Sequence, residues 1–193
     1  MLGLVQRVAK KLGLDEAAVA AIGLGERLKR GEYKQLKARY YEYQIRETAE
    51  EVGDSLWVGG ESYVNSNTVL GENVHLLGLD ILGDGRVTIG DNFHAGAGCR
   101  ILTENHNFDD GDALPYDDSF IQEPVEIGDN VWFGVNVTVL AGVTVEEGAV
   151  LQAGSVVVSD IPRGAIAGGH PAEVFDKRDM DHYEKLKAEE KFN

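Results

Sequence analysis

An apolar residue recurs at every sixth position through residues 127–157 of this 193-residue chain. The members of this column are Ile127, Phe133, Val139, Val145, Leu151 and Val157. A period of six matches neither the helical period of 3.6 residues nor the two-residue alternation of a half-buried strand. A short fixed repeat is typical of a solenoid, in which neighbouring coils cover one another's core. The column therefore predicts a β-solenoid.

The same column extends toward the N-terminus. It runs through Val52, Val58, Val64, Leu70, Leu76 and Leu82 and, after one extra residue, through Ile89, Ala95 and Ile101. Glycine often follows the apolar residue, and glycine, asparagine and aspartate supply tight turns. Fifteen hexads, three to a coil, predict about five coils stacked at ~4.8 Å. A glycine-rich sandwich with chance spacing would not hold one column through so many repeats.

The repeat divides the chain into three predicted parts. Residues 1–50 carry no hexad and space their apolar residues as helices do, with one helix expected over residues 24–51. The solenoid is expected over residues 51–161, interrupted by an inserted loop at 103–126. Residues 162–193 are expected to form a turn and then a helix over 179–191, which Asp179 or Asp181 would cap.

Composition narrows the partners and the compartment. The formal net charge of −15 argues against nucleic acid and anionic membranes, because both would repel the chain. The one cysteine, Cys99, excludes an internal disulfide and occupies a repeat position where small core residues belong. The first residues hold no apolar run long enough for a signal peptide or a membrane span. A cytoplasmic protein is the resulting expectation.

The inserted loop at 103–126 is the clearest functional signal in the chain. Long loops without a periodicity of their own are costly to order and are usually functional. This loop contains His106, flanked by Asn105 and Asn107, and also Tyr116. The ordinary pKa of histidine lies near neutrality, so His106 is a candidate for proton transfer with a substrate.

Three stretches resemble the hexapeptide-repeat acyltransferases, among them the maltose, galactoside, xenobiotic and surface-polysaccharide O-acetyltransferases. They are NHNF at 105–108, PVEIGDNVWFG at 124–134 and AGGHPAEV at 167–174. The resemblance implies a left-handed parallel β-helix and a homotrimer with active sites between subunits. It also implies transfer of an acetyl group from acetyl-CoA to a hydroxyl of a sugar, a related small molecule or a polysaccharide precursor. This reaction requires neither a metal nor a covalent enzyme intermediate.

In this family a catalytic histidine stands where such a loop leaves the helix, and His106 matches it. We expect His106 to be the general base for the attacking hydroxyl, with backbone amides holding the oxyanion. A carbonyl or a carboxylate, either Glu104 or a group of another subunit, is expected to orient the imidazole. Asn105, Asn107 and Tyr116 are expected to contact the acceptor.

The pantetheine arm of coenzyme A suits a groove between two β-helix walls, where small residues let it approach the backbone. The residues expected to bind it are Trp132, Gly134, Gly142, Ala153, Gly154, Ser159 and Arg178. Trp132 matches a family tryptophan near the cofactor, with packing at a subunit interface as the alternative. Ser159 and Glu173 stand where relatives have basic residues, so the nearby Arg163, Lys177 and Arg178 become candidate phosphate contacts.

Three other functions share the fold. N-acetylation of an amino sugar would use a similar base. A γ-class carbonic anhydrase would bind zinc through three histidines. His75 and His94 fall on the same side of successive coils, but no third histidine follows at the expected spacing and His106 lies on another side. The third is a non-catalytic scaffold, in which His106 would be a solvated loop residue, although a scaffold has no need of the loop.

Overall fold

The computed structural model describes residues 30–193, with side chains from residue 34 onward. The helices expected before residue 30 lie outside the described residues. The chain forms two compact units, Met1–Tyr40 and Tyr41–Asn193, and the second unit contains the solenoid. Within the described residues, no helix is long and apolar enough to cross a membrane.

Helix α3 (Arg30–Thr48) ends against the first coil of the second unit. Its last turns bury Tyr41 and Ile45. From the same end, Arg46 donates to the carbonyl oxygens of Gly53 (3.0 Å) and Asp54 (2.9 Å). These contacts cover the edge of the first coil, which would otherwise present unpaired backbone groups.

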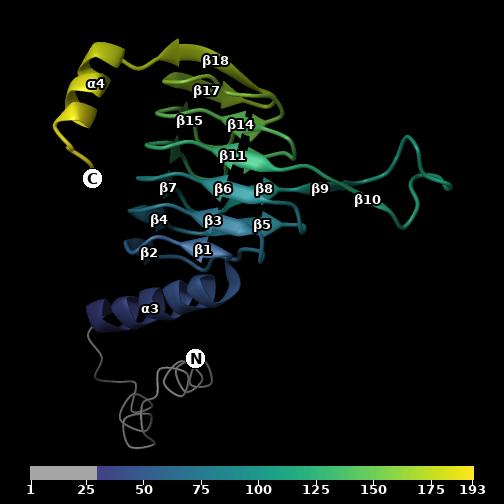
Figure 1. Cartoon of the computed structure of the whole chain (residues 1–193), viewed down its shortest axis with the longest axis horizontal. Helices are drawn as coiled ribbons and strands as arrows, with labels where there is room; N and C mark the ends of the chain where they lie inside the picture. The colour runs from purple at the N-terminus through teal and green to yellow at the C-terminus, as the bar shows by residue number, and fades with distance from the viewer. Residues whose placement is uncertain (1–29) are drawn as a thin grey trace, which may run out of the picture. The chain divides into compact units, whose positions relative to one another are not determined.

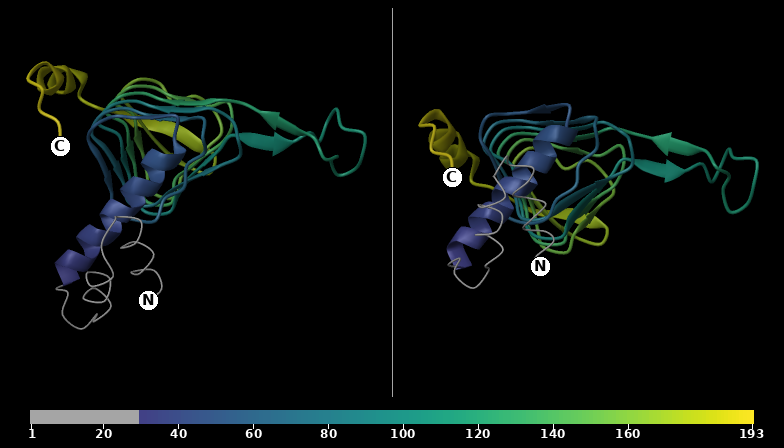
Figure 2. Two further views of the ribbon diagram at one scale, coloured as in Figure 1. Left: turned by 60° about the horizontal axis from the view of Figure 1, so that its bottom comes forward. Right: turned by 90° about the horizontal axis from the view of Figure 1, so that it is seen from below.

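The second unit is a left-handed parallel β-helix, seen from the side in Figure 1 and nearly along its axis in Figure 2. The first sheet contains β1 (Glu51–Val52), β3 (Thr68–Leu70), β6 (Val87–Ile89), β11 (Val125–Ile127) and β14 (Thr144–Val145). The second contains β2 (Leu56–Val58), β4 (Val74–Leu76), β7 (His94–Ala95), β12 (Trp132–Phe133), β15 (Val150–Leu151) and β17 (Ala165–Gly169). The third contains β5 (Leu79–Leu82), β8 (Cys99–Leu102), β13 (Thr138–Val139) and β16 (Val156–Val157). The predicted solenoid is therefore confirmed.

Most of the predicted apolar column is buried, but one member is wrong. Leu82 is 46% exposed, and Ile81 instead takes the inward position opposite Ile101. The spacing from the preceding column residue, Leu76, is thus five residues instead of six. Gly78 makes the shorter turn at a φ of +139°, which side-chain-bearing residues rarely adopt.

Aromatic rings and one thiol fill the middle of the core. The rings of Phe93 and Phe133 meet edge to face, with centroids 4.9 Å apart. Cys99 is buried beside them in the same coils, as expected, and its Sγ donates to the carbonyl oxygen of Gly134 (3.2 Å). Burial raises the pKa of the Cys99 thiol, which keeps it in the neutral form that a core tolerates.

The corner between the first and second sheets is built by an asparagine ladder, formed by Asn73, Asn92 and Asn130. All three adopt left-handed φ values of 55–59°, which asparagine tolerates better than most residues. The Nδ2 of Asn73 donates to Oδ1 of Asn92 (2.9 Å), and Nδ2 of Asn92 donates to Oδ1 of Asn130 (3.1 Å). In the next coil Gly148, at a φ of +73°, takes the same place without a side chain.

The C-terminal segment contributes more strand than expected. β17 continues the parallel ladder beyond β15, so the second sheet has one coil more than the five predicted. β18 (Ala172–Lys177) then returns antiparallel to β17, where only a turn was expected. Helix α4 (Met180–Ala188) follows, and Asp179 caps it by accepting a hydrogen bond from the backbone N of His182 (3.1 Å). The predicted helix and one of its two candidate caps are confirmed.

One hairpin interrupts the coils. β9 (Glu104–His106) pairs antiparallel with β10 (Phe120–Gln122) and projects away from the stack, on the side opposite α4 (Figures 1 and 2). The hairpin leaves the corner between the third and first sheets. At its base, the backbone N of Glu123 donates to the carbonyl oxygen of Thr103 (3.0 Å). The coil is therefore closed across the point where the hairpin departs.

Candidate active site

The hairpin holds the imidazole of His106 between two aromatic rings. Tyr116 stacks on it almost in parallel, with centroids 3.7 Å apart and planes 13° apart. Phe120, the cross-strand partner of His106, lies on it at 4.5 Å with a tilt of 36°. Ring contacts of this kind fix a side chain without a hydrogen bond. The imidazole orientation is therefore set by packing within the hairpin.

One nitrogen of this imidazole is covered and lacks a partner. The Nδ1 atom of His106 is buried and forms no hydrogen bond among the described residues. Leaving a buried polar nitrogen unpaired costs about 1–3 kcal/mol, so such atoms call for an explanation. The other edge of the ring carries Nε2, and this is the nitrogen left for a substrate.

The structure does not support Glu104 as the group that orients His106. The Glu104 carboxylate accepts hydrogen bonds from the backbone N of Asp84 (3.2 Å) and from Nε2 of Gln122 (3.3 Å). It is therefore committed to the base of the hairpin. In a single chain Glu104 forms no hydrogen bond with Nδ1 of His106, so a group of another subunit is the alternative that remains.

The polar loop residues mainly order the loop itself. Oδ1 of Asn105 accepts from the backbone N of His106 (3.0 Å), and Oδ1 of Asn107 accepts from that of Asp110 (3.1 Å). Asp117 accepts from the side chain and backbone of Ser119 and from the backbone N of Asp112, and these hydrogen bonds lower the pKa of Asp117. Asparagine and aspartate are common in turns because they bond their own backbone in this way.

The residues expected to bind coenzyme A do not gather at one place in a single chain. Trp132 lies on the outer face of the second sheet and is 53% exposed. Gly134, Ala153 and Gly154 follow at the corner between the second and third sheets, whereas Gly142 and Ser159 lie at the corner where the hairpin leaves. Arg178 precedes α4. The set is thus divided among two corners, one sheet face and the segment before α4.

Close packing of the coils accounts for part of this set. A Cβ at Gly134 would lie 2.6 Å from the backbone N of Ala153, so the next coil excludes any side chain there. Gly142 and Gly154 have φ values of +80° and +77°, a conformation that glycine adopts at little cost. Their identity is thus explained by the turn, whether or not a ligand lies beside them.

The two stacked histidines lie where the repeat predicted. His75 and His94 are paired in neighbouring strands, and their rings stack at 4.2 Å. Burial and then the charge of His94 lower the pKa of His75. Among the described residues, no group of three or more histidine, cysteine or acidic side chains could hold a metal ion. His106 belongs to the hairpin and contributes nothing to this pair.

Comparison with known proteins assigns the family. A family model described as the hexapeptide repeat of succinyl-transferase matches residues 124–159. The galactoside O-acetyltransferase of Escherichia coli (strain K12) is 33% identical over 147 residues, which cover 73% of this chain and 71% of that protein. A solved galactoside acetyltransferase in complex with coenzyme A, 27% identical with a TM-score of 0.61, covers 81% of this chain and 87% of its own. A maltose O-acetyltransferase from Clostridium difficile 630, 26% identical with a TM-score of 0.56, covers 91% and 87%.

The family model matches coils that follow the hairpin, and the two solved structures cover 81% and 91% of this chain. The chain belongs to the hexapeptide-repeat acyltransferase family. The expectation of an acetyltransferase built on a left-handed β-helix is thereby confirmed.

Proposed function

We propose that this protein transfers the acetyl group of acetyl-CoA to a hydroxyl of a sugar or related polysaccharide precursor, with His106 as the general base. The observation that carries the proposal is the imidazole clamped between Tyr116 and Phe120 on a projecting hairpin, with one nitrogen covered and the other free. The matched galactoside and maltose enzymes are named as O-acetyltransferases, and one of them was solved with coenzyme A.

The reaction needs two proton transfers, from the acceptor hydroxyl to His106 and from His106 to the sulfur of coenzyme A. Nε2 of His106 takes the proton of the acceptor hydroxyl while its oxygen attacks the thioester carbonyl. The carbonyl oxygen becomes an oxyanion, which backbone N–H groups stabilise. The tetrahedral intermediate collapses to the ester, and the departing CoA sulfur receives the proton from the imidazolium. Neither a covalent enzyme intermediate nor a redox step enters this balance.

For Nε2 to accept a proton, the neutral imidazole carries its hydrogen on Nδ1. That hydrogen then needs an acceptor, and within the described residues Nδ1 has none. We assign the missing acceptor to a carbonyl or carboxylate of a neighbouring copy. This assignment follows the alternative that remains once Glu104 is committed elsewhere.

We further propose a homotrimer with active sites between subunits. The residues expected to bind coenzyme A lie on the outer surfaces of the coils, while His106 lies on the projecting hairpin. The hairpin also exposes Phe108, Phe120 and Ile121, and exposed apolar groups of this kind favour burial against another surface. A second copy would bring a coil face and a hairpin together. Sedimentation or light scattering at several concentrations tests the trimer.

Calorimetric titration with acetyl-CoA, beside a metal analysis of the same sample, tests the donor without knowledge of the acceptor. Saturable binding near one equivalent per subunit is expected. Transfer to sugars and to amino sugars is then compared between the native chain and His106→Ala, with His182→Ala on the exposed face of α4 as the matched control. Loss of turnover in His106→Ala alone is expected, and turnover that survives this change refutes the mechanism.

A further inference from the structure

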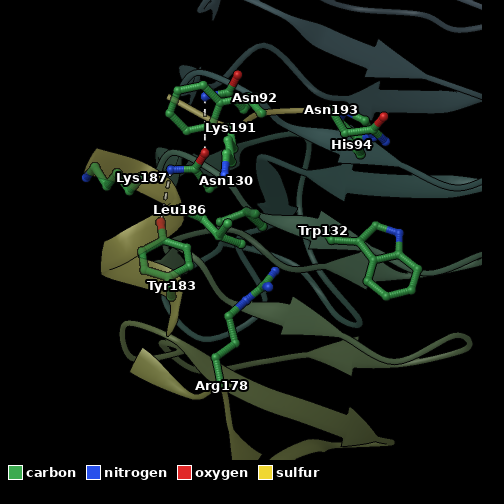
Figure 3. Close-up of a pocket in the computed structure, with 12 residues that line it drawn as sticks. Asn92, His94, Asn130, Trp132, Arg178, Tyr183, Leu186, Lys187, Lys191 and Asn193 are labelled. Carbon is green, nitrogen blue, oxygen red and sulfur yellow. Dashed lines mark hydrogen bonds between the residues drawn. The ribbon is translucent and has the colours of Figure 1, made fainter. Parts of the chain in front are cut away.

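A cavity of about 500 Å³ lies between the outer face of the second sheet and helix α4 (Figure 3). The asparagine ladder closes one side through Asn92 and Asn130, and His94 and Trp132 supply the sheet. Helix α4 and the residues after it form the opposite wall. This volume lies within the range of small-molecule sites, which combine apolar surface with a few placed polar groups.

The charge of the lining contrasts with that of the chain. The whole sequence contains 33 acidic and 18 basic residues. Yet Arg178, Lys187 and Lys191 line this cavity, and no aspartate or glutamate is among its described lining residues. A concentration of cations on the wall of a cavity in so acidic a chain selects an anionic ligand.

Arg178 is prepared for such a ligand. Its Nε donates to the carbonyl oxygen of Gly148 (2.6 Å), and its guanidinium lies 5.7 Å from the ring centroid of Tyr183. Its Nη atoms have no hydrogen-bond acceptor in the part of the chain that the structure describes. In Figure 3 the guanidinium points into the space between α4 and Trp132. A guanidinium held by one nitrogen presents its remaining donors to a carboxylate or phosphate as a fixed pair.

The two lysines differ in how free they are to bind an anion. Lys187 pairs with the part-buried Glu147, which also accepts a hydrogen bond from the hydroxyl of Tyr183, so its ammonium group is already held. Lys191 pairs with Glu189, and its side chain is 63% exposed. Exposed ion pairs contribute little, so an anion in the cavity competes for the ammonium group of Lys191 at small cost.

The remaining walls suit a polyhydroxylated ring. The indole of Trp132 is 53% exposed and offers an apolar face. Each of the two amides has one N–H in use: Nδ2 of Asn92 donates to Oδ1 of Asn130 (3.1 Å), and Nδ2 of Asn130 donates to the hydroxyl of Tyr183 (2.9 Å). The second N–H of each amide is left for a ligand. The ladder holds these donors in place before any ligand arrives, which lowers the entropic cost of binding.

We propose that this cavity binds an acidic sugar, one that carries a carboxylate or a phosphate. Its anionic group lies against Arg178 and Lys191, its ring packs on Trp132, and its hydroxyls meet the amides of Asn92 and Asn130. That this sugar is the acetyl acceptor rests on the proposed function, whereas its binding does not.

The test uses the fact that the chain has two tryptophans. In a Trp57→Phe background, Trp132 is the one tryptophan whose fluorescence reports on the cavity. The full-length protein is titrated with glucuronate, glucose 6-phosphate, glucose and inorganic phosphate. We expect one of the acidic sugars to bind at least tenfold more tightly than both glucose and phosphate, and which one does so identifies the carboxylate or the phosphate as the anionic group.

Charge-removing variants assign the site. Arg178→Gln and Lys191→Gln are each expected to weaken binding of the preferred sugar at least fivefold by calorimetry. Arg100→Gln, which removes an exposed charge from the third sheet, is expected to leave it unchanged. Lys191 is largely exposed, so its variant remains informative if Arg178→Gln loosens α4.

Three results overturn the proposal: no saturation by either acidic sugar, inorganic phosphate binding as tightly as glucose 6-phosphate, or equal weakening in the Arg100 control. Trp132 and Arg178 were also expected to bind coenzyme A, but none of these titrations contains acetyl-CoA or depends on His106. A failed cavity and a failed acetyltransferase assay are therefore separate results.

Discussion

The docking of α4 on the coils depends on the absence of a side chain at Gly148. A Cβ at this position would lie 3.1 Å from the ring carbons of Tyr183, and the φ of Gly148 is +73°. Gly154 provides the matched control, because its φ is +77° and nothing lies within 4 Å of its added Cβ. Gly148→Ala and Gly154→Ala therefore share the backbone strain, and only the first disturbs α4.

The magnitudes follow from these contacts. The left-handed conformation costs an alanine about 1–2 kcal/mol at either site. At Gly148 the ring of Tyr183 must also move. Its hydroxyl donates to Glu147 (2.7 Å) and accepts from Asn130 (2.9 Å), and each such bond contributes about 0.5–1.5 kcal/mol. We expect Gly148→Ala to lose about 1–2 kcal/mol more than Gly154→Ala when both bonds are weakened.

Denaturant unfolding followed by circular dichroism, at one protein concentration, measures both losses in free energy of unfolding. In a Tyr183→Ala background the alanine at position 148 meets no ring, so its cost is expected to fall to that of Gly154→Ala. Equal losses for the two single variants, or an unchanged difference in the Tyr183→Ala background, would refute the reasoning.

Two further predictions concern the imidazoles. Tyr116→Phe keeps the ring stacked on His106 and is expected to keep kcat. Tyr116→Ala removes the ring and is expected to lower kcat about 10- to 100-fold, because the base is then misplaced. Steady-state kinetics measures both variants, and equal rates would contradict a positioning role for Tyr116. Burial and the charge of His94 lower the pKa of His75 below 6.5. Its contribution to stability is therefore present above pH 6.5 and lost as the pH falls toward the folded pKa. His75→Asn is expected to flatten this acid limb in unfolding titrations, and an unchanged limb would exclude the pair as its cause.

The coils could be predicted because each hexad places one apolar residue in the core in the same way. The six-residue period is still recognisable when one position departs from it, so most core residues can be identified from the sequence. Leu82 was wrongly predicted to point into the core because the turn at Gly78 is one residue shorter than the others. The sequence shows that a glycine is present there but not which φ it adopts. β17 and β18 were missed because their inward and outward residues do not follow the six-residue column.

The candidate site was predictable only in part. His106 stands out because it interrupts the repeat, but its contact with Tyr116 joins residues ten apart in a loop without periodicity. No spacing rule predicts that a tyrosine at this position will stack on the imidazole. The cavity beside α4 was missed for a similar reason, since it forms only when the C-terminal helix returns to coils that are far away in sequence.

The hydrogen bond from the backbone N of Glu123 to the carbonyl oxygen of Thr103 joins the two ends of the hairpin, so the coil beneath does not depend on the hairpin for its closure. Because the coil is already closed beneath it, the hairpin can lengthen, shorten or change its residues without altering the register of any strand above or below. A solenoid of this kind is free to diversify at one corner while its core stays constant. The segment that carries His106 can therefore be exchanged as a unit during evolution. A loop grafted between residues 103 and 123 would be attached at the same hydrogen-bonded base.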